Sequence, residues 1–186
     1  MTDNKHEFIC PKCKHKITIN IPEELNEDNI DDLLSRSYFK SVCKHCHNIL
    51  FLDYPVKLRT KNYYIYYTPT NNKKQKQVDN LITRVCDTYD DFKEKILILN
   101  DNLNDIIVEL LKSYIKKELK DNNKYTNSII RYDSKNEENL VFTLVDDKQN
   151  VGISLDIYNQ LLESSKIKKI NKGICIDNTN YFKYIK

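Results

Sequence analysis

Glycine and tryptophan are nearly missing from this chain, which has two glycines and no tryptophan among 186 residues. Two isolated glycines, Gly152 and Gly173, cannot form the glycine-rich loop that cradles a nucleotide phosphate. Long apolar runs are missing too: no segment approaches the roughly 20 apolar residues of a membrane span, and the start MTDNKHEF lacks the apolar core of a signal peptide. We therefore expect a cytoplasmic protein with no membrane contact.

The net charge is also small. The formal charge of +3 is too weak to predict a polyanionic partner from electrostatics alone. A hydrophobic content of 40% is enough for a core, and a mean hydropathy of -0.65 indicates a strongly polar surface.

Cysteine provides the clearest motif. Cys10-x-x-Cys13 and Cys43-x-x-Cys46 are separated by 29 residues. Two such knuckles can aim four thiolates at one point, which is the donor set of a tetrahedral structural zinc site. We therefore predict that these four cysteines bind one structural Zn²⁺ ion.

The flanking segments support a zinc ribbon. HEFIC and SYFKSVC lead into the knuckles, while HKITINI and NILFLDY lead out, and each has the pattern of a strand. The spacer between them contains Ile30, Leu33 and Leu34 at helical spacing, which predicts a short helix or loop. A thioredoxin-type redox pair needs its cysteine at a helix start, so the strand pattern after Cys13 argues against that alternative.

Three histidines accompany the knuckles: His15, His45 and His47. Any of them could replace a cysteine as a ligand. With four cysteines in register, we expect the histidines to stay outside the ligand set, where they can donate hydrogen bonds to thiolates.

With both knuckles placed, the chain resembles the bacterial and archaeal CpXC family, which is named for its Cys-Pro-x-Cys motifs. CPKC at 10–13 matches the motif in full, and CKHC at 43–46 has Lys44 where proline is expected. Lys14 and His47 stand where family knuckles commonly end in glycine. The resemblance covers about residues 6–120. It implies a cysteine-bound metal and no established reaction.

The remaining sequence predicts an α+β architecture. We expect a zinc-ribbon-like β domain at 1–70, a basic polar linker at 71–77, and an α+β unit at 78–186. In that unit a strand at LITRVCDTY precedes a helix at about 89–99 and a second helix from Asn102 to about Leu119. Three strands follow in NSIIRYD, NLVFTLVD and VGISLD, then a helix in IYNQLLESSKI and a last strand pair in GICID and YFKYI. The fold expected is an amphipathic helix pair packed on an antiparallel sheet.

Catalytic motifs are missing from the pattern. All four histidines lie within the first 47 residues, so no Ser–His–Asp set can be nominated. A four-cysteine zinc site has no open position for water. Carboxylates near the two helix starts are explained by the helix dipole: Asp90, Asp91, Glu94, Asp101 and Asp105. We therefore expect no enzyme.

Three functions remain. The leading hypothesis is a non-enzymatic module that binds another protein, and a homodimer is left open. The first alternative is nucleic-acid binding, with Lys12, Lys14, Lys16 and Lys44 at the knuckles and Tyr64 and Tyr66 as a stacking surface. We favour an ordinary buried strand for these tyrosines. The second alternative is a thiol redox or zinc-release sensor.

Overall fold

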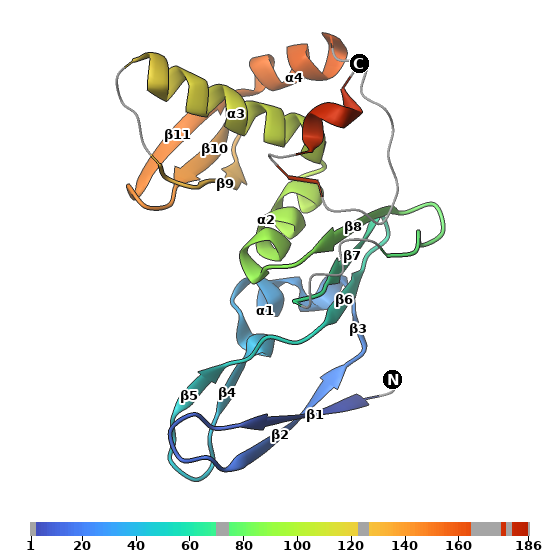
Figure 1. Cartoon of the computed structure of the whole chain (residues 1–186). Coiled ribbons are helices and arrows are strands. Elements are labelled where there is room, and N and C mark those ends of the chain that lie inside the picture. The colour runs from blue at the N-terminus through green and yellow to red at the C-terminus, as the bar shows by residue number, and fades with distance from the viewer. Residues whose placement is uncertain (1–2, 70–74, 123–126, 165–175, 178–179, 186) are drawn as a thin grey trace. The chain divides into compact units, whose positions relative to one another are not determined.

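The computed structural model describes residues 3–69, 75–122, 127–164, 176–177 and 180–185 (Figure 1). The described chain forms two compact units, which divide between Lys93 and Glu94. No helix in the described ranges combines the length and apolar content needed to cross a bilayer.

Unit 1 contains two hairpins that carry the knuckles. β1 (Asp3–Ile9) pairs antiparallel with β2 (Lys16–Pro22), and β4 (Lys40–Val42) pairs antiparallel with β5 (Ile49–Phe51). Between them lie β3 (Glu24–Leu25), a short 3₁₀ turn, α1 (Ile30–Leu34) and a second 3₁₀ turn. The predicted strands around each knuckle and the short helix between the hairpins are confirmed.

A four-stranded sheet forms the other part of unit 1, in the order β3-β6-β7-β8. β6 (Val56–Arg59) and β7 (Tyr63–Tyr67) are antiparallel, whereas β8 (Ile82–Cys86) runs parallel to β7. Aromatic side chains fill the core beneath it. Phe39 contacts Tyr54 and Tyr67 with ring centroids 5.0 and 5.5 Å apart.

The position of β8 differs from the expected domain division. The sequence places it in the C-terminal unit, after a linker at 71–77, but its backbone pairs with β7 in unit 1. Residues 71–74 of that tract lie outside the described ranges. The reason for the difference is that strand pairing is long-range, so a local composition change cannot reveal which sheet a strand joins.

Unit 2 is built from the end of α2 (Tyr89–Asn100) together with α3 (Asp105–Asp121), β9 (Ile130–Lys135), β10 (Asn139–Leu144), β11 (Gln149–Ser154) and α4 (Leu155–Ser164). The three strands form an antiparallel sheet in the order β11-β10-β9. The apolar stripe of α3 packs on this sheet, in a core that includes Ile107, Leu111, Ile115, Leu140 and Phe142. The predicted helix on an antiparallel sheet is confirmed.

Two details of unit 2 correct the sequence prediction. The N-cap of α3 is Asn104 and not Asn102, because the Asn104 side chain accepts hydrogen bonds from the Ile106 and Ile107 amides. The last predicted strand, YFKYI, is instead a 3₁₀ helix at Tyr181–Tyr184. Its proposed partner GICID, like the end of IYNQLLESSKI, lies mainly outside the described ranges. Short aromatic runs fit a strand pattern without specifying one.

Candidate metal centre

The two knuckles have the same backbone geometry. In the first, the Lys14 amide donates to the Cys10 carbonyl at 2.9 Å, and the Cys10 amide donates to the His15 carbonyl at 2.9 Å. In the second, the amides of His47 and Cys43 make the equivalent bonds at 2.8 and 2.9 Å. Each turn therefore holds its two cysteines in one fixed orientation, as a metal-binding knuckle requires.

The four sulfur atoms converge on one point. Sγ of Cys10 lies 3.6 Å from Sγ of Cys46, and Sγ of Cys13 lies 3.6 Å from Sγ of Cys43. All four lie within 4.8 Å of one another. A tetrahedron of sulfur atoms about 2.3 Å from a central ion has edges of about 3.8 Å. The residues therefore fit a tetrahedral, thiolate-bound ion.

Local hydrogen bonds shift the cysteine pKa values. The backbone amide of Cys13 lowers the pKa of the Cys10 thiol to about 6, against the opposing effect of burial. The pKa of Cys43 is lowered in the same way by the amide of Cys46. At Cys13 the amide of His15 lowers the pKa, but burial and the other sulfur atoms together outweigh it and raise the pKa. The knuckle amides thus stabilise the thiolate forms of Cys10 and Cys43. The close approach of the four sulfur atoms, with no cation between them, disfavours deprotonation of all four thiols.

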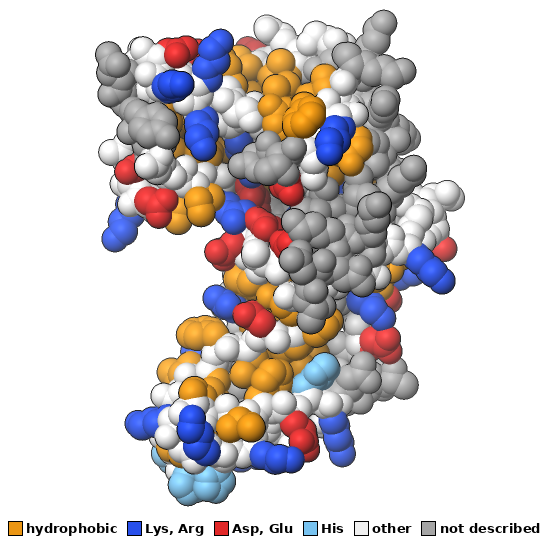
Figure 2. Space-filling model, in the orientation of Figure 1, with side chains coloured by type: hydrophobic (Ala, Val, Ile, Leu, Met, Phe, Trp, Pro, Cys, Tyr) orange, Lys and Arg blue, Asp and Glu red, His pale blue; other side chains and the backbone are white. Residues whose placement is uncertain are grey.

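Two of the three histidines meet beside this centre. The rings of His15 and His45 are stacked, with centroids 3.7 Å apart. Together with Cys13 they form a second group of donor atoms within 4.8 Å of one another, and His47 belongs to neither group. Histidine side chains are prominent on the surface at the end of the hairpins (Figure 2). The sequence pattern did not predict this pairing.

The comparison with protein families bears directly on the two knuckles. The model of the family described as CpXC protein matches residues 8–112, more than half of the chain and both C-x-x-C motifs. The chain belongs to the CpXC family. Searches of curated proteins and of solved structures each found no match. The CpXC match covers most of the region that the sequence resemblance delimited.

The tyrosines offered as a stacking surface are not available for it. Tyr64 is only 4% exposed, and its hydroxyl donates to Oε2 of Glu24 at 2.7 Å. Tyr66 is half-buried and packs against Tyr64 with ring centroids 4.8 Å apart. The buried strand that the sequence favoured is therefore confirmed. Exposure could not be read from the alternation of tyrosines because β7 is covered on both faces.

The lysines proposed for nucleic acid are all exposed: Lys12, Lys14, Lys16 and Lys44. Lys16, however, forms an ion pair with Glu7 at 3.0 Å. These lysines form a small basic group around the knuckles, but the tyrosines of β7 do not supply an exposed aromatic surface for stacking.

The outer face of the β4–β5 hairpin is apolar and exposed. Val42 and Ile49 are directly paired across the strands, and Phe51 lies two residues further along the same face. Their exposed fractions are 50%, 53% and 61%, unusually high for such side chains. Hydrophobic side chains are gathered at the surface where this hairpin lies (Figure 2). Lys40, which pairs with Phe51 across the strands, adds a charge to this apolar face.

A groove beside β3 and β6 is a second feature that the sequence did not signal. It has a volume of about 780 Å³ and is lined in part by Glu23, Glu24, Lys57 and Arg59. These charges pair with one another: Lys57 with Glu23 at 2.7 Å and Arg59 with Glu24 at 3.3 Å. Asp28 also lines the groove, so one acidic charge remains beyond these two ion pairs.

Unit 2 contains a buried charge network that sequence reasoning missed. Glu94 on α2 accepts hydrogen bonds from Lys112 on α3 at 2.9 Å, Arg131 at 2.9 Å and the Tyr132 amide at 2.6 Å. Lys112 also donates to Glu109 at 2.8 Å. Burial raises the pKa of Glu109, and Lys112 acts against that shift. The network links two helices to β9.

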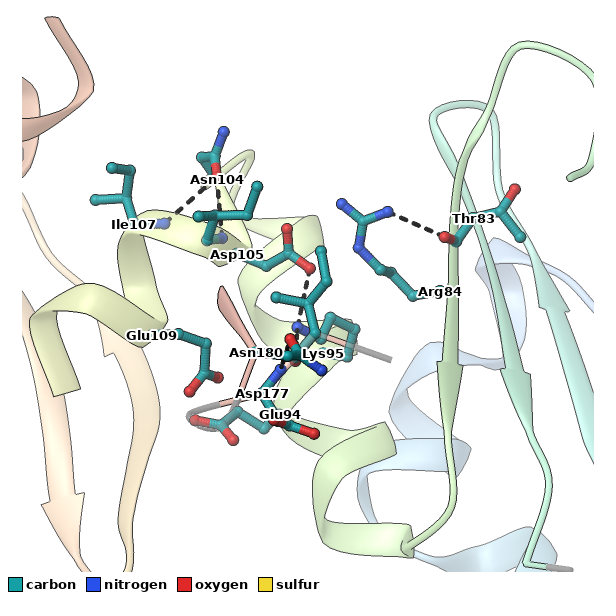
Figure 3. A network of polar contacts seen from close by, with 12 residues as sticks. Thr83, Arg84, Glu94, Lys95, Asn104, Asp105, Ile107, Glu109, Asp177 and Asn180 are labelled. Carbon is teal, nitrogen blue, oxygen red and sulfur yellow. Dashed lines mark hydrogen bonds and ion pairs between the residues drawn. The ribbon is translucent and has the colours of Figure 1, made fainter. Parts of the chain in front are cut away.

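A second buried pair corrects the helix-dipole interpretation. Asp105 is 2% exposed and bonds Lys95 at 2.9 Å (Figure 3). Asp101 accepts a hydrogen bond from the Tyr132 hydroxyl. With Glu94 in the network above, these three carboxylates bind partners inside unit 2. Position near a helix start did not distinguish them from Asp90 and Asp91, because the partners come from distant parts of the chain.

Proposed function

We propose that this CpXC protein is a cytoplasmic, non-enzymatic module ordered by one structural Zn²⁺ ion, and that it binds another protein through the outer face of β4–β5. The single observation that supports it most is the pairing of a closed four-sulfur centre with the exposed apolar face of Val42, Ile49 and Phe51 on the same hairpin.

The donor set supports zinc as the ion. Four thiolates at tetrahedral distances suit Zn²⁺, and four cysteine ligands leave no position for a substrate or an activated water. Zinc bound in this way contributes folding energy instead of catalysis. No disulfide joins the five cysteines that the structure describes. Elemental analysis of the purified chain tests the identity and the stoichiometry of the ion.

The chemistry of the apolar face supports a particular kind of partner. A large exposed apolar patch rimmed by charge is typical of a protein-binding surface. Lys40 lies on this face and Lys44 in the adjoining knuckle, and both are exposed. An extended protein segment with apolar and acidic side chains would match both features. The two strands form a sheet of their own, so a partner strand could also add to an edge.

The test uses a double variant of the apolar face. Val42→Ser with Phe51→Ser should abolish capture of specific partners in quantitative co-purification, because it removes apolar contact without touching a cysteine. The matched control is Val145→Ser, an exposed apolar residue of unit 2. Equal capture by the double variant and the wild type would refute this docking surface. Analytical ultracentrifugation distinguishes a homodimer, which the double variant would dissociate.

Nucleic-acid binding is the first alternative, supported by the exposed lysines at the knuckles. A gel shift that weakens with salt at a slope of several charges would favour it. No shift at low salt would exclude it. A thiol sensor is the second alternative, supported by the lowered pKa of Cys10. Peroxide treatment that leaves bound zinc unchanged would exclude that role.

A further inference from the structure

Beside the four-cysteine centre, the knuckles bring together a second set of donors. His15 follows the first knuckle and His45 lies within the second, yet their rings stack at 3.7 Å with 13° between the planes. Both side chains are exposed, so hydrophobic burial does not hold them together. The two knuckles meet at the four-sulfur centre, and this places the two imidazoles where a single ligand can contact both.

We propose that His15, His45 and Cys13 form a second metal site, for Zn²⁺ or a similar borderline divalent ion, in which the Cys13 thiolate bridges two ions. The three donor atoms lie within 4.8 Å of one another. Imidazole nitrogen and thiolate sulfur are the ligands that zinc prefers. Three protein donors leave the fourth position to water, so this ion is held more weakly than the first and exchanges faster.

Charge favours a second cation at this place. Four thiolates around one divalent ion keep a net negative charge, and a cation bound next to them is attracted. Cys13 is half-buried, whereas Cys10 and Cys43 are buried. Cys46 is half-buried as well, but among the described residues only the Cys13 sulfur forms a donor group with both histidines.

Binding requires a small rearrangement of the rings. The nitrogen lone pair of imidazole lies in the ring plane, so stacked parallel rings must turn about χ2 to direct two lone pairs at one ion. The χ2 wells of histidine are broad, and exposed side chains turn at little cost. The competing explanation is stacking of the two rings with no ion, in which case the chain binds a single equivalent of zinc.

The first experiment measures stoichiometry on the full-length chain loaded with one equivalent of zinc. Isothermal titration with Zn²⁺ should show a second, weaker equivalent. The double variant His15→Gln with His45→Gln should lose that equivalent and keep the first. The matched control is His47→Asn, which removes a histidine of the same knuckle outside the group and keeps a residue that tolerates positive φ. A wild type that binds a single equivalent, or a double variant that still binds two, would overturn the proposal.

The second experiment asks whether sulfur holds the second ion. Adding Co²⁺ to the one-zinc protein should produce a thiolate-to-cobalt charge-transfer band, because zinc is spectroscopically silent and Cys13 would bind both ions. The double variant should show no band. Cobalt binding without the band would mean that surface histidines alone hold the ion, which contradicts the shared thiolate. A band of equal intensity in the double variant would mean that cobalt has replaced the first zinc ion, which also contradicts the site.

This site presupposes the first metal ion but not the protein-binding role. Loss of partner capture in the apolar-face variant and loss of the second equivalent in the histidine variant are measured separately. Either can therefore fail without the other.

Discussion

Two residues close the knuckles in a backbone conformation that suits glycine better. Lys14 has φ 61° and His47 has φ 55°, both in the left-handed region. The family resemblance pointed to these positions, because related knuckles commonly end in glycine there. The chain keeps the knuckle geometry without glycine and accepts the strain.

We therefore expect Lys14→Gly to stabilise the metal-loaded chain. Removing the Cβ relieves a left-handed strain of about 1–2 kcal/mol but adds chain entropy, for a net gain of about 0.5–1 kcal/mol. Urea unfolding measures this net change in the free energy of unfolding. Lys16→Gly is the control, because Lys16 begins β2 and should lose stability on the same change. Equal effects at both positions would show that φ does not decide the outcome.

Tyr63 illustrates a buried polar atom whose cost can be measured. Its hydroxyl is buried without a hydrogen-bond partner among the described residues, and burial raises its pKa to about 12. Between about pH 10 and 12 the folded chain therefore keeps a proton that the unfolded chain has lost. The free energy of unfolding therefore decreases as the pH rises through that window, because the unfolded chain gains stability by releasing the proton.

Tyr63→Phe should leave stability at neutral pH unchanged or raise it by about 1 kcal/mol, since no hydrogen bond is lost. It should also weaken the fall in stability above pH 10. The neighbouring change Tyr64→Phe removes the bond to Glu24 and should destabilise the chain. Thermal unfolding across this pH range checks both changes, and a loss at Tyr63 as large as at Tyr64 would contradict the assignment.

The helices of unit 2 depend on capping and on buried charge. Asn104 caps α3, while Asn102 has φ 56°. Asn104→Ala should cost about 1 kcal/mol, because it leaves helix amides without an acceptor. Asn102→Gly should cost nothing, since glycine accepts that φ more readily. Urea unfolding that ranks these variants in the opposite order would contradict Asn104 as the cap of α3.

The network around Lys112 ties α2, α3 and β9 together. Lys112→Met should destabilise the chain by about 3–5 kcal/mol, because it leaves the carboxylates of Glu94 and Glu109 buried beside one another without their shared cation. Adding Glu94→Gln should recover part of that loss, since it removes one of the two charges. A double-mutant cycle by urea unfolding measures the coupling. Strict additivity would argue against a shared network.

The two compact units predict a two-part response to metal removal. Chelation should unfold the hairpins of unit 1, because a structural zinc site supplies folding free energy of the order of 10 kcal/mol. The helical circular-dichroism signal of unit 2 should largely persist. Cys10→Ser with Cys43→Ser should reproduce the effect. Cys86→Ala is the control, because Cys86 is buried in β8 away from the four-sulfur group. Full retention of unit 1 strands after chelation would refute the structural role.

The sequence by itself determined the four-cysteine donor set, the strands around it and the amphipathic helix on its sheet. Each of these depends on local spacing or periodicity. Tertiary structure alone decided that β8 joins the sheet of unit 1, that Tyr64 is covered, that His15 meets His45, and that Glu94 and Asp105 are buried with partners. These outcomes depend on contacts between residues far apart in the chain, and local patterns do not encode which distant surfaces meet.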